Sequence, residues 1–228
     1  MNHEHDHDHS HAHDHAHGDG HDHTHPPQRD HDAGPMGAYE VMEEALRLLL
    51  IEKGVLTDAE IASQIDLIDS RSPALGAKVV ARAWVDPGFK TRLLEDCRKA
   101  LLEMEIEIGQ IAEFKVVENT AGTHNVIVCT LCSCYPKLLL GIPPAWYKSL
   151  AYRSRTVIDP RGVLAEFGVK IPKSQEVRVH DSTADLRYIV LPMRPKGTEG
   201  LTETALAGLV SRDSMIGTAV PVPMSTGR

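Results

Sequence analysis

One stretch of the sequence, residues 126–136, reads Val-Ile-Val-Cys-Thr-Leu-Cys-Ser-Cys-Tyr-Pro. Its first three residues form a short apolar run rich in β-branched side chains, which predicts a strand. Cys129, Cys132 and Cys134 then fall in one tight turn between this strand and the helix that we expect after Pro136. Six residues, here called the cysteine claw (129–134), can therefore present three thiols to a single metal ion.

The spacing of these cysteines leaves several interpretations open. Structural zinc is the usual occupant of a Cys-x-x-Cys pair, but a closed zinc site draws further ligands from elsewhere, and the body of the chain offers Cys97 and His124 for this purpose. An apolar turn whose thiols bind nothing is a second possibility. Cys132 and Cys134 lie too close in sequence for an unstrained disulfide. Metal or redox chemistry is therefore the prediction from the residues alone.

Working outward from the claw, the periodicity of apolar residues divides the chain into a helical part and a mixed part. We expect helices over residues 38–54, from 57 through 65, over 74–86 and over 88–104, and strands over 114–117, 126–129, 177–179 and 186–191. Asp159-Pro160 predicts the start of a further helix, and another is expected over 203–211. The sequence thus predicts a helical N-terminal region, 36–108, and a metal-binding α+β catalytic domain, 109–228.

Residues 1–35 differ from the rest of the chain. Twelve of the 14 histidines lie in residues 1–33 among acidic and small residues, so we expect a disordered His-rich tail. His3-Glu4-x-x-His7 matches the zinc-protease pattern, but that chemistry requires a buried helix, which such a tail cannot provide. A reservoir for divalent transition metals is one interpretation of the tail. An expression tag or solubilising arm is the other.

Charge and hydropathy exclude several classes of function. The formal charge of −8 comes mainly from residues 1–33, which contain eight acids and one base, so the body is close to neutral and lacks the basic excess of a nucleic-acid-binding protein. No apolar run is long enough to span a membrane, and the N-terminus lacks the pattern of a signal peptide. We therefore expect a cytoplasmic protein that binds neither nucleic acid nor membrane.

The claw and its surroundings resemble the α subunit of nitrile hydratases. The similarity covers roughly residues 38–218 and includes Leu75-Gly76-Ala77-Lys78, Ala83-Trp84-x-Asp86-Pro87, Pro143-Pro144-Ala145-Trp146-Tyr147-Lys148-Ser149, Tyr152-Arg153-Ser154-Arg155, Arg187-Tyr188 and Arg212-Asp213-Ser214-Met215. The resemblance implies an α+β fold in which a helical N-terminal arm precedes a layered α-β-β-α domain. It also implies hydration of nitriles to amides. The γ subunit of thiocyanate hydrolase carries the same claw and is the alternative, and a metal-storage or metal-delivery protein is a third hypothesis.

The resemblance also implies roles for the residues of the claw. Cys129 would be the axial thiolate ligand, Cys132 and Cys134 would be oxidised to sulfinate and sulfenate, and the backbone amides of Ser133 and Cys134 would complete the set of metal ligands. Thr130 and Tyr135 are typical of the cobalt-type motif, which implies Co(3+), with Fe(3+) as the alternative. Cys134 would be catalytic, because its oxygen is one candidate for the nucleophile.

Three further residues and several partners follow from the same resemblance. It points to Gln110 as a residue near the metal, and to Asp181 and Asp185 as acids that support arginines of a β subunit. The expected assembly is an αβ heterodimer or a higher oligomer, with a small nitrile as substrate and an activator or cobalt chaperone as maturation partner. Lys137 departs from the family pattern, in which a tryptophan follows the claw. It either faces the pocket and favours small polar or anionic substrates, or reaches solvent or the partner.

Overall fold

The computed structural model describes residues 37–109 and 112–223, so the predictions for the His-rich tail and for Gln110 lie outside the described residues. The described helices are α1 Ala38–Glu52, α2 Asp58–Asp69, α3 Pro73–Val85, α4 Pro87–Glu95, α5 Cys97–Leu102, α6 Lys137–Leu140, α7 Ala145–Lys148, α8 Leu150–Ile158, α9 Pro160–Glu166, α10 Glu203–Ala207 and α11 Arg212–Ile216. The described strands are β1 Glu113–Glu118, β2 Thr123–Val128, β3 Glu176–Asp181 and β4 Leu186–Leu191. No helix among these residues is both long and apolar enough to cross a membrane.

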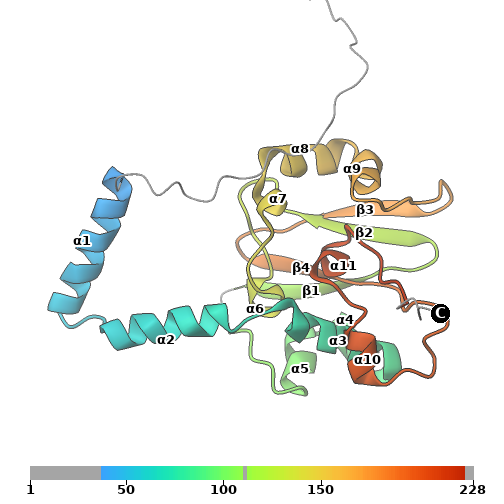
Figure 1. The fold of residues 1–228 in the computed structure, drawn as a ribbon, viewed down its shortest axis with the longest axis horizontal. Coiled ribbons are helices and arrows are strands. Elements are labelled where there is room, and N and C mark those ends of the chain that lie inside the picture. Colours follow the sequence, from blue (N-terminus) through green and yellow to red (C-terminus); the bar gives the residue numbers. More distant parts are fainter. Residues whose placement is uncertain (1–36, 110–111, 224–228) are drawn as a thin grey trace, which may run out of the picture.

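The strands form two parallel pairs, β1 with β4 and β2 with β3. Figure 1 shows α8 and α9 over the β2–β3 pair and α3, α4, α5 and α10 on the far side of the β1–β4 pair. The predicted α-β-β-α layering is thereby confirmed. The register pairs Val128 with Asp181, which places the ends of β2 and β3 side by side just before the claw.

The core lies between these layers, and its packing fixes the position of β2. Val126, Ile127 and Val128 are fully buried, as the apolar run predicts. Gly217, which follows α11, has a φ of 96°, and a Cβ atom at this position would lie 2.1 Å from the carbonyl oxygen of Asn125. Only glycine allows this close approach, so the C-terminal segment can pack directly against β2.

The structure corrects the prediction of one helix over residues 88–104. The segment forms two helices, α4 and α5, separated by Asp96 in an extended conformation. The carboxylate of Asp96 accepts a hydrogen bond from the backbone amide of Lys99, 3.1 Å away, and so caps the N-terminus of α5. Apolar periodicity continues across the break, which is why the pattern did not reveal it.

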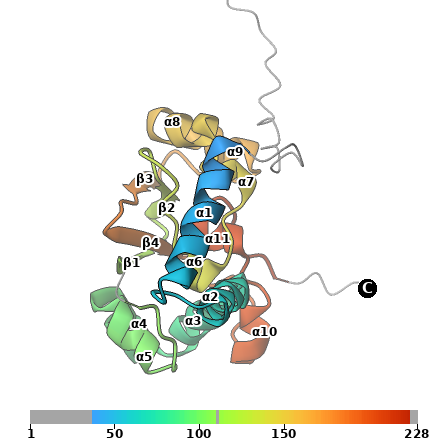
Figure 2. The ribbon, with the colours of Figure 1, turned by 90° about the vertical axis from the view of Figure 1, so that its left-hand side faces the viewer.

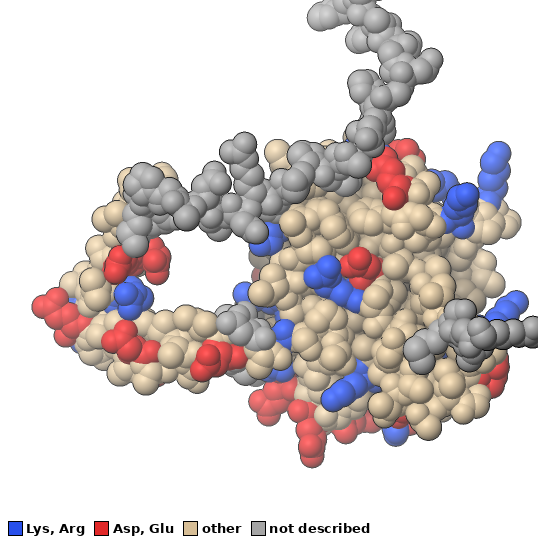
Figure 3. Space-filling view, viewed as in Figure 1, with Lys and Arg blue, Asp and Glu red and all other residues tan. Residues whose placement is uncertain are grey.

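Helices α1 and α2 form an arm that projects from the layered domain in Figure 1 and faces the viewer in Figure 2. Large apolar side chains are exposed along α1, including Tyr39 at 85%, Met42 at 62% and Leu46 at 55%. Figure 3 shows acidic side chains along the same arm, with uncharged surface between them. An arm with this much exposed apolar surface is typical of a segment that packs against another chain.

Candidate metal centre

The claw begins where the pairing of β2 with β3 ends. The last backbone hydrogen bond between the two strands and their ends is donated by the amide of Ser182, the residue after β3, to the carbonyl oxygen of Val128 at 2.7 Å. The chain then turns through residues 129–134. The Sγ atoms of Cys129 and Cys132 lie 3.5 Å apart, and those of Cys132 and Cys134 lie 3.2 Å apart. All three sulfur atoms lie within 4.8 Å of one another, so the chain brings the predicted thiols together.

The surroundings of the three thiols differ. Cys129 and Cys134 are buried, whereas Cys132 is exposed. Hydrogen bonds from the neighbouring thiols and from the backbone amides of Ser133 and Cys134 lower the pKa of Cys132 to about 7. Burial raises the pKa of Cys134, partly offset by the positive charge of Arg187. The backbone amides that the resemblance assigns as ligands therefore lie near the central sulfur atom.

Asp181, which the resemblance assigns to arginines of a β subunit, contacts the claw itself in this chain. Its carboxylate accepts hydrogen bonds from the backbone amide of Thr130 at 2.9 Å and from the hydroxyl of the same residue at 2.5 Å. Asp185 lies instead in the turn between β3 and β4, where it is exposed. No hydrogen bond of its carboxylate to another described residue was found. The two acids thus have different surroundings, and only Asp181 touches the claw.

Helices α7 and α8 hold the claw from the other side, through contacts that the sequence did not predict. The hydroxyl of Tyr147 donates to the carbonyl of Cys134 at 2.9 Å. The guanidinium of Arg153 donates to the carbonyls of Cys129 and Thr130 at 3.0 and 2.8 Å. These residues were visible only as parts of the quoted similar segments, because their partners lie 13 to 24 positions away.

The interpretation as a closed zinc site loses support from the positions of the other candidate ligands. Among residues 37–109 and 112–223, the group of side chains that could hold a metal ion contains the three claw cysteines and neither Cys97 nor His124. Burial raises the pKa of Cys97 to about 12, as expected for an unreactive core thiol. His124 is buried too, and its Nε2 lies 2.7 Å from the carbonyl oxygen of Gly217. Both residues therefore serve packing.

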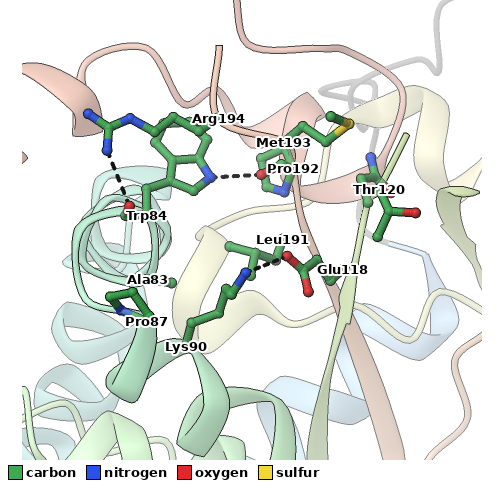
Figure 4. A pocket seen from close by; sticks show the side chains of 11 residues that line it. Ala83, Trp84, Pro87, Lys90, Glu118, Thr120, Leu191, Pro192, Met193 and Arg194 are labelled. Atoms are coloured by element: carbon green, nitrogen blue, oxygen red, sulfur yellow. Dashed lines mark hydrogen bonds and ion pairs between the residues drawn. The ribbon is translucent and has the colours of Figure 1, made fainter. Parts of the chain in front are cut away.

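A separate cavity of about 320 Å³ lies between α3, α4 and the end of β4 (Figure 4). The indole of Trp84 donates to the carbonyl of Pro192 at 2.8 Å, and Lys90 forms an ion pair with Glu118 at 2.9 Å. No claw residue lines this cavity. Its prominent polar groups form hydrogen bonds and an ion pair with one another, so Trp84 has a packing role.

Comparisons with known proteins place this geometry in a family. The model of the family "Nitrile hydratase, alpha chain" matches residues 37–219. The low-molecular-weight cobalt-containing nitrile hydratase subunit alpha of Rhodococcus rhodochrous is 52% identical over 183 residues, covering 80% of this chain and 88% of the relative. The thiocyanate hydrolase subunit gamma of Thiobacillus thioparus is 41% identical over 196 residues, covering 81% of each chain.

A solved structure from the same family has a similar fold. A double mutant of the Fe-type nitrile hydratase from Comamonas testosteroni Ni1 superimposes with a TM-score of 0.76 at 41% identity. The superposition covers 84% of this chain and 94% of that chain. Relatives of the cobalt type and a structure of the iron type are therefore both similar to this chain.

Proposed function

This chain belongs to the nitrile hydratase α-chain family, and we propose that it hydrates nitriles to amides at a cobalt(III) centre held by the cysteine claw. The observation that carries the proposal is the grouping of the Cys129, Cys132 and Cys134 sulfur atoms within 4.8 Å of one another. Three thiols at the end of a buried strand, with one exposed to solvent, form a donor set open on one side.

The donor set of three thiols fits a transition metal or zinc better than magnesium or calcium. Thiolates are soft ligands that favour cobalt, iron or zinc over magnesium or calcium. The amides of Ser133 and Cys134 interact with the Cys132 sulfur, so two nitrogen atoms accompany the three sulfur atoms. Cobalt is preferred because cobalt-containing relatives are about half identical to this chain, while the iron-type structure keeps Fe(3+) as the alternative.

The reaction requires water to add across the carbon–nitrogen triple bond without any change of oxidation state. A bound cobalt(III) ion would supply a Lewis acid with one open position. Water is one candidate for the nucleophile. The other is the oxygen atom of Cys134, oxidised to sulfenate by dioxygen before catalysis; after this oxygen has bonded to the nitrile carbon, a water molecule would have to break the bond between sulfur and oxygen, which restores the sulfenate and releases the imidate. The nitrile nitrogen takes up a proton, and the resulting imidate tautomerises to the amide. Asp181 orients the claw throughout by holding Thr130.

Nitrile hydratase α subunits pair with a β subunit, and we propose that the α1–α2 arm contributes to that interface. Leu46 is 55% exposed and Met42 is 62% exposed on α1. Leu46→Asp should reduce co-purification with the β subunit and leave the unfolding temperature of the isolated chain unchanged. Glu43→Gln, which removes a charge on the same helix without changing its apolar side chains, is the control. Normal co-purification of Leu46→Asp would exclude this face of α1 from the interface.

Replacing each claw cysteine in the αβ complex tests the proposed reaction. Cys129→Ser, Cys132→Ser and Cys134→Ser should each abolish bound cobalt and amide formation from acetonitrile or acrylonitrile. Cys97→Ser is the matched control, because this buried thiol lies outside the metal-ligating group. Full activity in any of the three claw variants would contradict the proposal.

Thiocyanate hydrolysis is the second candidate function. Its support is the similarity to the thiocyanate hydrolase γ subunit, together with an exposed lysine, Lys137, three positions after the last claw cysteine. A positive charge near the open side of the claw would attract an anionic substrate. Release of ammonia from thiocyanate by the purified complex, measured beside nitrile hydration, distinguishes the two.

A further inference from the structure

Arg153 of α8 binds the claw where the strand ladder can no longer do so. The carbonyl of Val128 is the last one on β2 to receive a backbone hydrogen bond from the β3 side. The next two carbonyls accept hydrogen bonds from Arg153 instead. Its Nε donates to the carbonyl of Cys129 at 3.0 Å, and its Nη2 donates to the carbonyl of Thr130 at 2.8 Å. One guanidinium therefore replaces two missing strand partners at the entrance to the turn.

Helix α8 is itself fixed to the same strand, so Arg153 acts from a rigid support. The hydroxyl of Tyr152, a fully buried residue, donates to the carbonyl of Ile127 at 2.7 Å. The side chain of Ser149 caps the N-terminus of α8. Adjacent residues on one helix thus bind a carbonyl near the end of β2 and two carbonyls just beyond it, which transmits the position of α8 to the claw.

Thr130 is held from both sides. Arg153 donates to its carbonyl, while Asp181 accepts from its amide and hydroxyl. No carboxylate of the described residues forms an ion pair with Arg153, so its guanidinium is directed at backbone carbonyls. A lysine could preserve the charge there, but its ammonium lacks the planar fork that reaches two carbonyls at once.

We infer that Arg153 is a positioning residue that holds the Cys129 end of the claw in its ligand geometry before the metal binds. The inference rests on the proposed metal centre and extends it to a residue that does not touch the metal. Because the claw is an irregular segment, removing two of its restraints should allow Cys129 to move away from the other two sulfur atoms. Charge alone should not restore the geometry.

The test compares reduced, metal-free full-length wild type with Arg153→Lys and Arg153→Gln. Hydrogen–deuterium exchange should be faster in residues 130–135 of both variants. The affinity for cobalt(II) should fall about tenfold or more in both variants. It is measured by the thiolate-to-cobalt absorption band, which the histidines of residues 1–33 do not produce. Arg155→Gln is the matched control, because Arg155 lies on α8 but pairs with Glu166 instead of the claw.

Hydrogen exchange and cobalt affinity in Arg153→Lys that equal the wild-type values would overturn the inference. Changes in these two quantities that are no larger than those in Arg155→Gln would overturn it too. If Arg153→Gln fails to fold, Arg153→Lys decides, since it keeps the charge and most of the side-chain volume. Absence of cobalt–thiolate absorption in wild type would count against the proposed function. The exchange measurement needs no metal and would still decide whether Arg153 holds the claw.

Discussion

The carboxylate of Asp181 accepts two hydrogen bonds from Thr130, one from the backbone amide at 2.9 Å and one from the hydroxyl at 2.5 Å. This contact joins the end of β3 to the second residue of the claw. It follows from the parallel register, in which Asp181 lies beside Val128. A carboxylate is a stronger acceptor than a carbonyl, so the contact restrains the claw from the β3 side.

Asp181→Ala should weaken metal retention and nitrile hydration by about 10- to 100-fold, the range typical of residues that orient metal ligands. Thr130→Val should act in the same direction, because it removes one of the two donors. Thr130→Ser keeps the hydroxyl and is the control. Metal content and amide formation measured on the same preparations check this prediction, and wild-type values in Asp181→Ala would contradict it.

Mass spectrometry of the claw peptide from active enzyme should find about two added oxygen atoms on Cys132 and one on Cys134. Cys97 should remain unmodified, because it is buried and its thiol pKa is raised to about 12. Sulfenate is labile, so trapping with dimedone before digestion is part of the measurement. An active enzyme whose three claw thiols are all unoxidised would contradict the proposed role of Cys134.

Lys137→Trp should raise the turnover of benzonitrile relative to acrylonitrile and reduce any hydrolysis of thiocyanate. The lysine is exposed at the start of α6, three positions after Cys134, and no partner for its ammonium was found among the described residues. Tryptophan removes the positive charge and adds an aromatic surface. Unchanged substrate ratios would place the side chain outside the substrate pocket.

Acidification should destabilise the protein in part through His124. Burial lowers the pKa of this histidine below the ordinary histidine value of about 6.5, so the unfolded state binds a proton that the folded state excludes. The free energy of unfolding should therefore fall as the pH drops below about 6.5. His124→Gln should show a smaller fall between pH 7.5 and pH 5.5, measured by urea unfolding. An equal fall would contradict this assignment.

The sequence predicted local features of the structure better than its long-range contacts. The apolar run 126–128 correctly indicated a strand ending at the claw, and Asp159-Pro160 correctly indicated the start of α9. The break at Asp96 was missed because apolar spacing continues through it. Arg153 was missed as a claw contact, since only folding brings α8 to the end of β2.

Cobalt content measured together with activity tests the central claim most directly. The αβ complex, purified from cobalt-supplemented cells after removal of loosely bound metal with a chelator, should retain about one cobalt ion per α chain and convert acrylonitrile to acrylamide. The Cys132→Ser complex should retain none and form no amide. Stoichiometric zinc without cobalt in the wild-type complex, or amide formation by a cobalt-free complex, would contradict the account.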